Sequence, residues 1–333
     1  MSTTKYFYEL TVSSSPHCHG PLTTRRIMLD VVIALCLPLA GGIWFFGLRA
    51  LVMALVSVGA CVFFEWGYRR MMRKDPTCTD LSAVVTGLLL ALVCPPTLPF
   101  WALIVGDLFA IVVVKQLYGG IGKNFMNPAL AGRAFLMFSW PAAMSTWVVP
   151  GRQNLLWISA DAVTAATPLS AMHTGALPET GLTDLLWGNV GGCMGETSAV
   201  LILLGALYLV IRRVISPRIP LCYLGTAAAL AFLFPRGNDR LIWTAYTLLS
   251  GGLLLGAFFM ATDYVTTPVT KWGQAIFGIG CGVITIVIRY FGAIPEGVSF
   301  SILVMNACVV LLDRVGRPKR YGWQKPKKEG KTA

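Results

Sequence analysis

Ten apolar segments, most of them near the length that crosses a bilayer, constrain the fold of this chain more than any other feature. A hydrocarbon core about 30 Å thick needs about 20 apolar residues per helix. With short breaks at Gly, Pro and charged residues taken as turns, the segments are 27–46, 49–67, 80–96, 99–118, 128–149, 190–212, 219–234, 241–261, 273–290 and 298–314. Only 13% of the 333 residues are charged, against roughly 25% in soluble domains. The sequence therefore predicts an all-α integral membrane protein with about ten transmembrane helices.

The basic residues predict how these helices are oriented. Lys and Arg near helix ends favour the cytoplasmic side. If the N-terminus is cytoplasmic, every basic residue falls on an inner segment except Arg49, Arg152, Arg236, Arg240 and Arg289. We therefore expect a multi-pass protein of the cell inner (cytoplasmic) membrane with both termini in the cytoplasm. The basic excess is then an orientation signal, and it does not indicate a partner nucleic acid.

Two parts of the chain resemble each other weakly. TGLLLALVCPP from Thr86 is echoed by SGGLLLGAFFMATD from Ser250, and LYGGIGKNFMNPALAGR from Leu117 by RYFGAIPEGVSFSILVMN from Arg289. Five helices per copy would invert the second copy, an arrangement that places binding sites at the interface between the copies, often where helices are broken. Shared Gly and Leu composition is the competing explanation of the likeness.

This repeat defines the expected organisation of the chain. It comprises a cytoplasmic segment 1–26, a first five-helix repeat 27–149, an extracytoplasmic loop 150–189, a second five-helix repeat 190–314 and a basic cytoplasmic tail 315–333.

Acidic residues within apolar segments are candidates for an ion path. Asp107 lies well inside the fourth segment and Glu196 near the outer part of the sixth. A carboxylate inside a membrane is costly, so it suggests an ion path, a proton relay or a partner charge. The acids nearer the segment ends, for which an interfacial position is expected, are Asp30, Glu65, Asp80, Asp263 and Asp313. The nine cysteines include no C-x-x-C pair, and no metal site is expected.

The string GGIGKNFMNPALAGR at 119–133 is a second candidate region. Asn127 and Pro128 are typical of a helix N-cap and first helical position, and a helix N-terminus can bind an anionic group or flavin carbonyls. Gly120, Asn124 and Asn127 are therefore candidate cofactor contacts, although a plain turn and cap would explain them equally well. The glycines do not follow a strand, so this is not a dinucleotide-binding fingerprint. Arg133 requires a partner inside the membrane.

The outer loop contains DAVTAATPLSAMH, which by composition alone is an ordinary turn or cap. Its Asp161-x-x-Thr164-x-Ala166-Thr167-x-Leu169 pattern, however, resembles the flavinylation motif of the RnfD/NqrB family. That resemblance extends over nearly the whole chain, through SSPH, TGLLLA, KQLYGGIGKNFMNPA, LLGAFFMATDYVTTP, IRYFGAIPEGVSFSILVMN and RPKRYG. Thr164 stands where Ser is common and Ala165 where Gly is common, and both keep the site small.

The resemblance implies that Thr167 carries FMN through a phosphoester bond. Asp161, Thr164 and Ala166 would be read by a flavin transferase, and a second, non-covalent flavin is compatible with the family. The chain would be one subunit of an Rnf-type complex that relays electrons between ferredoxin and NAD with coupled transport of Na⁺ or H⁺. It would not be a complete enzyme, and no catalytic residue is expected in it. The alternatives are a channel or secondary transporter of inverted-repeat architecture, or a membrane scaffold, and both would lack the flavin.

Overall fold

The computed structural model describes residues 23–75, 77–148, 167–178 and 180–315. Within these ranges the secondary structure is helical, apart from a single bridge residue at Val148. The expected all-α fold is therefore confirmed.

The helices before residue 140 form the first half of the molecule. They are α1 (Thr24–Phe46), α2 (Leu48–Met71), the short η1 (Cys78–Asp80), α3 (Ser82–Leu92), α4 (Phe100–Leu108) continued by the π-helix η2 (Phe109–Gln116), and α5 (Pro128–Ser139). Three short helices, α6 (Pro141–Met144), α7 (Pro168–His173) and α8 (Leu182–Trp187), belong to the connection between the halves.

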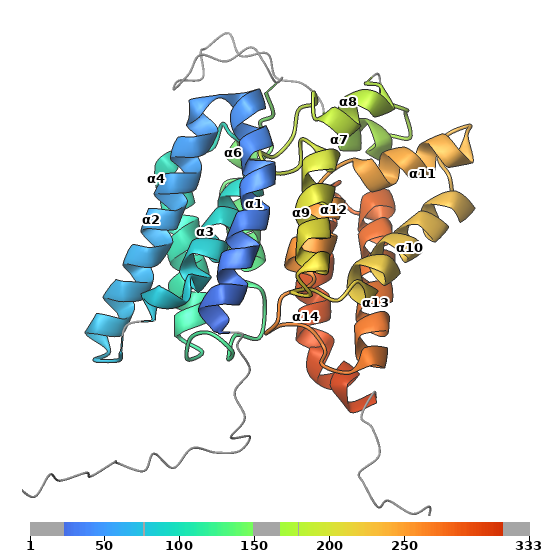
Figure 1. The fold of residues 1–333 in the computed structure, drawn as a ribbon. Coiled ribbons are helices and arrows are strands. Elements are labelled where there is room, and N and C mark those ends of the chain that lie inside the picture. The colour runs from blue at the N-terminus through green and yellow to red at the C-terminus, as the bar shows by residue number, and fades with distance from the viewer. Residues whose placement is uncertain (1–22, 76, 149–166, 179, 316–333) are drawn as a thin grey trace, which may run out of the picture.

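In the second half the π-helical piece precedes the two longest helices. It comprises α9 (Ala199–Ile211), α10 (Arg218–Leu233), α11 (Arg240–Leu249), α12 (Leu253–Leu255) continued by the π-helix η3 (Gly256–Met260), α13 (Lys271–Phe291) and α14 (Val298–Val315). Figure 1 shows the two halves side by side.

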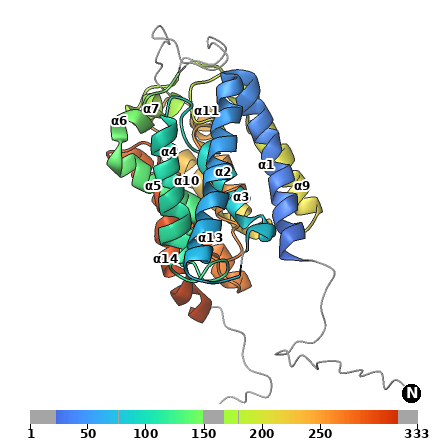
Figure 2. The ribbon, with the colours of Figure 1, turned by 90° about the vertical axis from the view of Figure 1, so that its left-hand side faces the viewer.

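The halves meet through helices of the same rank. The first helices pack together, α1 on α9, as do the last, α5 on α14, and α1 lies beside α9 in Figures 1 and 2. Arg212, just after α9, pairs at 3.2 Å with Asp30 near the start of α1, and Phe138 at the end of α5 packs against Phe300 at the start of α14. Both helix pairs are therefore antiparallel, as an inverted repeat requires.

The helices differ in whether they are long enough to cross a membrane. Among the described residues, α1, α2, α13 and α14 meet this requirement by length and composition, and α11 with α12–η3 form a fifth candidate bent by 63°. Helices α3, α9 and α10 are apolar but shorter. The prediction of about ten crossings thus stays a prediction, while the multi-pass character is supported.

Several segments end earlier than their apolar runs do, and proline and glycine explain where. Helix α3 stops at Leu92 ahead of Pro95 and Pro96, and α5 stops at Ser139 ahead of Pro141, because a residue before proline is disfavoured in the helical region. The expected span 128–149 is therefore wrong in its second half.

Two breaks occur in the second half. The expected span 190–212 becomes helical only at Ala199, where Ser198 Oγ accepts a hydrogen bond from the Leu201 N–H. The expected span 241–261 breaks around Gly251, whose φ of 66° favours glycine. The chain before α9 contacts the end of α3, where the Gly195 N–H donates to the Leu92 carbonyl at 2.8 Å.

The start of α1 and the end of α14 lie at one end of the molecule, while α7 and α8 lie at the other (Figure 1). We call these the inner and outer ends. Their separation agrees with the predicted placement of the termini opposite the long connection.

Candidate functional site

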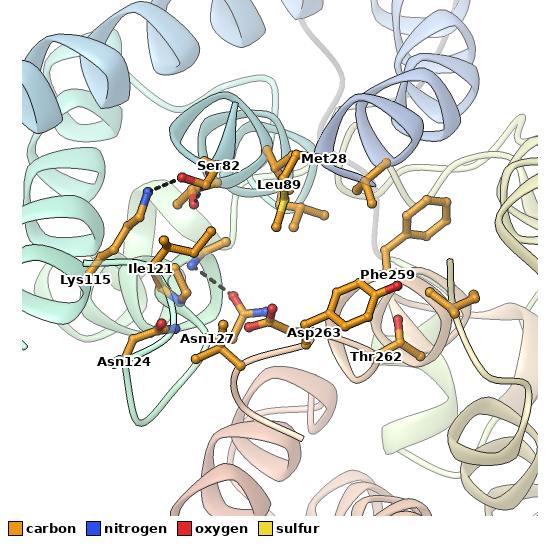
Figure 3. Close-up of a pocket in the computed structure, with 18 of the residues that line it drawn as sticks. Met28, Ser82, Leu89, Lys115, Ile121, Asn124, Asn127, Phe259, Thr262 and Asp263 are labelled. Atoms are coloured by element: carbon orange, nitrogen blue, oxygen red, sulfur yellow. Dashed lines mark hydrogen bonds between the residues drawn. The ribbon is translucent and has the colours of Figure 1, made fainter. Parts of the chain in front are cut away.

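A cavity lies between the two halves near the inner end. Its walls come from α1, α3, η2, α5, α9 and η3, and from the chain that follows η3. In Figure 3, Lys115 and Ser82 occupy one side and Phe259 and Thr262 the other. We call this the inner cavity.

Asn127 holds the start of α5 at the wall of this cavity. Its Oδ1 accepts hydrogen bonds from the Ala129 N–H at 3.0 Å and the Leu130 N–H at 3.4 Å, and Pro128 is the first helical residue. Its Nδ2 donates to the carbonyl of Met260 at the end of η3. The predicted cap is therefore confirmed, and the same side chain joins the two halves.

Asn306, in the middle of α14, contacts Asn127. With the amide of Asn306 oriented to satisfy its neighbours, its oxygen accepts from the Asn127 N–H at 3.2 Å and its nitrogen donates to the Thr266 carbonyl at 3.0 Å. Asn127 and Asn306 thus meet at the interface between the halves.

The other candidates from the 119–133 string separate into two groups. Asn124 lines the inner cavity, and its amide also donates to the Met126 carbonyl. Gly120 does not line the cavity; it has a φ of 91° and donates its N–H to the Lys115 carbonyl. Gly120 therefore serves the turn that carries the asparagines, and only the asparagines face the cavity.

A buried ion pair beside the cavity was not expected from the sequence. Lys115 Nζ lies 2.7 Å from Glu65 Oε2 and 2.7 Å from Ser82 Oγ, and Glu65 is only 1% exposed. Asp30, another acid expected at the interface, is likewise buried and is paired with Arg212. The depth of both acids in the membrane stays a prediction. The missed signal is the pattern of Ser57, Cys61 and Glu65, which recurs every four residues and places three polar side chains on one face of α2.

Asp263 lines the inner cavity from the chain after η3. Burial raises the pKa of its carboxyl group, although Thr266 Oγ1 donates to it at 3.1 Å and stabilises the charged form.

A second pocket, with about 400 Å³ of empty space, lies at the outer end and includes Thr167. Thr167 is the N-cap of α7: its Oγ1 accepts a hydrogen bond from the Ser170 N–H at 3.2 Å, and the residue is half-buried. Gly191, Gly192 and Gly251 leave space around it. We call this the outer pocket. Asp161, Thr164 and Ala166 lie outside the described residues.

The outer pocket extends to a group of charged residues. Glu196 and Glu296 both line it, and their carboxylates lie within 4.8 Å of each other and of Cys193 Sγ. Arg133 pairs with Glu296, donates to Ser299 Oγ at 2.8 Å and lies 3.5 Å from Cys193 Sγ. The partner that Arg133 requires is thus Glu296, and this guanidinium compensates one of the two acids.

Glu196 is less well satisfied than Glu296. Its Oε1 is buried without a hydrogen-bond partner among the described residues, and a Cβ on Gly252 would lie 2.5 Å from that oxygen. Glycine at 252 therefore makes room for this acid at the pocket. Asp107, the other predicted ion-path residue, lies in neither pocket.

Comparisons with known proteins agree on one family. The family model described as "NQR2, RnfD, RnfE family" matches residues 11–322. An RnfD-type component of the sodium-translocating ferredoxin:NAD⁺ oxidoreductase complex of Acetobacterium woodii is 47% identical, covering 97% of this chain and 98% of that protein. Its counterpart in the proton-translocating complex of Clostridium ljungdahlii is 40% identical, covering 94% and 96%. The corresponding component of an ion-translocating oxidoreductase complex of Escherichia coli is 34% identical, covering 94% and 99%.

Proposed function

The chain belongs to the NQR2, RnfD, RnfE family, and on this premise we propose that it is the RnfD-type component of an ion-translocating ferredoxin:NAD⁺ oxidoreductase complex and relays electrons through FMN attached to Thr167. The relatives named for this complex match over nearly their full length. The other subunits of such a complex are then its partners.

The observation that carries the flavin proposal is the position of the Thr167 hydroxyl. It lies in a pocket that three glycines help to line, and its Oγ1 is used inside the described part of the chain only as an acceptor from Ser170. The Thr167 hydroxyl donates no hydrogen bond to a described residue, so forming a phosphoester at this oxygen would break none. FMN held in this pocket would accept and donate electrons.

The charged residues of the outer pocket would determine the field around that flavin. Glu196 and Glu296 place two acids at the pocket, and Arg133 places a guanidinium against one of them. A polar environment fixed in this way is how a protein tunes a bound redox group.

The inner cavity is suited to a second, non-covalent flavin. Its walls are mostly apolar and its polar groups few, among them Asn124, Asn127, Thr262 and Asp263, which is typical of cofactor sites. The asparagine side chains and backbone of the 124–127 turn would contact the polar edge of the ring.

The remaining parts of the proposal concern maturation and orientation. A flavin transferase would modify Thr167 outside the cytoplasm, and Na⁺ or H⁺ would be the transported ion. The inner end would then face the cytoplasm and the outer end the opposite side of the cell inner membrane.

The test is in-gel flavin fluorescence of the denatured chain, expressed with a flavin transferase. We expect wild type to fluoresce and Thr167→Ala to lose the signal. Thr174→Ala is the matched control, because Thr174 is an exposed threonine in the turn that ends α7 and donates only to the Ala171 carbonyl; this variant should fluoresce like wild type.

Two outcomes would overturn the proposal. Equal fluorescence of Thr167→Ala and wild type would mean that the flavin is attached elsewhere. A fully matured wild type without fluorescence would remove the electron-carrier function and favour a channel or secondary transporter, which needs no flavin.

A further inference from the structure

Asp107 is a buried carboxyl group without a charged partner among the described residues. It lies near the end of α4 and is 0% exposed. Its Oδ1 lies 2.6 Å from Ser57 Oγ and 3.3 Å from Cys61 Sγ, both on α2. Its Oδ2 is also buried and has no hydrogen-bond partner in the described part of the chain. The groups that hold this acid are therefore neutral.

The charged groups around Asp107 are paired with other residues. The titratable groups on the surrounding elements are Cys94 after α3, Lys115 on η2, Arg133 on α5 and, on α2, Cys61, Glu65, Arg49, Tyr68, Arg69 and Arg70. Lys115 donates to Glu65 and Ser82, and Arg133 pairs with Glu296. No hydrogen bond described for Asp107 comes from a cation. An ionised carboxylate in this position would be costly, because the residue is 0% exposed and no described residue supplies a counter-charge.

Counting hydrogens at Ser57 leads to the same conclusion. Its Oγ lies 2.9 Å from the Gly87 carbonyl oxygen as well as 2.6 Å from Asp107 Oδ1. A serine hydroxyl has one hydrogen, and a carbonyl oxygen can only accept. If Ser57 donates to Gly87, the short contact to Asp107 is a hydrogen bond only when Asp107 supplies the second proton. Both distances are then explained by a neutral Asp107.

Gly87 fixes this geometry by letting α3 approach α2 closely. A Cβ at position 87 would lie 2.9 Å from three backbone atoms of Ser57 and Val58, closer than real contacts allow. The small residue therefore brings its own carbonyl within reach of the Ser57 hydroxyl.

We propose that Asp107, Ser57 and the Gly87 carbonyl form a proton-binding site between α2, α3 and α4. In the loaded state Asp107 donates its O–H to Ser57, and Ser57 donates to Gly87. When the proton leaves Asp107, the Ser57 hydroxyl turns to donate to the carboxylate, which Cys61 also contacts. The site thus has two hydrogen-bond arrangements that differ by one proton.

Polar residues on one face of α2 indicate the path along which this proton exchanges. Ser57, Cys61 and Glu65 follow one another at intervals of one helical turn, and Glu65 contacts Lys115, which lines the inner cavity. We assign exchange to the inner end along this face. The use of the site in ion translocation rests on the proposed function, whereas the binding of the proton does not.

The test is infrared spectroscopy of the purified complex, which detects the carbonyl stretching band of a protonated carboxylic acid. At neutral pH we expect a band in wild type that is lost in Asp107→Asn. Asp30→Asn is the matched control, because Asp30 is buried but paired with Arg212; this variant should keep the band. Ser57→Ala keeps Asp107 but removes the acceptor of its proton and should shift the band, so it tests the assignment even if Asp107→Asn does not assemble.

The possible outcomes separate this inference from the flavin proposal. An unchanged band in both Asp107→Asn and Ser57→Ala would overturn the site. A wild-type band that disappears when NaCl replaces KCl at constant pH would overturn the proton assignment and identify Na⁺ as the occupant. Neither result depends on fluorescence at Thr167, which reports the flavin separately.

Discussion

The two halves of the molecule bury polar groups at corresponding helix interfaces, but with different chemistry. In the second half, α10 packs on α13, and Tyr223, Thr285 and Ser301 hydrogen-bond to one another at 2.7–3.1 Å. In the first half, α2 packs on α4 and η2, and the interface contains Asp107 and the Glu65–Lys115 pair.

The difference lies in whether each group is satisfied. Each of the three hydroxyls has one hydrogen and an acceptor for it: Thr285 can donate to the Cys281 carbonyl, Ser301 to the Val298 carbonyl, and Tyr223 to Thr285 or Ser301. The cluster is therefore closed. The first half retains a carboxyl oxygen on Asp107 that has no partner among the described residues. A closed neutral cluster specifies packing, whereas an unsatisfied acid at the same depth has a cost that a function must justify. We therefore interpret the second-half interface as structural and the first-half interface as a proton-binding site.

The largest expected effect comes from breaking the charged pair of the first half. Lys115→Met should destabilise the protein by about 3–5 kcal/mol, because it leaves the Glu65 carboxylate buried without its counter-charge. The double variant Glu65→Gln/Lys115→Met should recover most of this loss, since it removes both charges. The measurement is the fraction of protein that remains monodisperse in size-exclusion chromatography after heating in detergent.

The control for this variant is an ion pair with a more accessible cation. Arg212→Met removes the partner of Asp30, but the Arg212 side chain is 41% exposed, so water can replace it and the loss should be about 1 kcal/mol or less. Equal losses for Lys115→Met and Arg212→Met would show that the first-half interface is solvated, and the contrast between the halves would fail.

The second prediction concerns the glycines that allow close helix packing at both interfaces. Gly87→Val on α3 and Gly282→Val on α13 should each cost about 1–3 kcal/mol or more, because a Cβ would lie 2.9 Å from backbone atoms of α2 and from the Tyr223 carbonyl, respectively. Both interfaces depend on small residues for close helix approach. The same heating assay measures the loss.

Glycines without neighbours provide matched controls on the partner helices, away from the interfaces. A Cβ at Gly59 on α2 or Gly225 on α10 would meet nothing within 4 Å. Gly59→Val and Gly225→Val should therefore stay within about 1 kcal/mol of wild type, a range set by helix propensity alone. A large loss in these controls would mean that valine is harmful anywhere in these helices, whatever the packing.

Local features of the sequence predicted local features of the structure. The Asn127–Pro128 cap follows from residue type, and Pro95, Pro96 and Pro141 mark where the helices end early. Partners distant in the chain could not be predicted this way. Arg133 meets Glu296, which lies 163 residues away, and only the folded arrangement brings them together.

The position of Thr167 illustrates the other limit. Composition favoured an ordinary helix cap, and the structure confirms that Thr167 is one. The flavin at this residue was suggested only by resemblance to a family, since neither the cap nor the pocket dictates a phosphoester. Conversely, the spacing of Ser57, Cys61 and Glu65 in the sequence marks a polar face of α2. Considering Glu65 by itself, as an interfacial residue, misses this face.

The smallest expected effects come from removing one polar group from each interface. Tyr223→Phe should cost about 1 kcal/mol, because the buried hydroxyls of Thr285 and Ser301 lose a partner. Asp107→Asn should cost less, because a neutral amide can still donate to Ser57 as the protonated acid does. Thermal unfolding of the two variants in the same detergent measures both effects. If Asp107 were ionised in wild type, Asp107→Asn would remove a buried charge and stabilise the protein by a few kcal/mol. The sign of the change in stability of Asp107→Asn therefore decides whether Asp107 is neutral in wild type. Proton binding at Asp107 requires that it is.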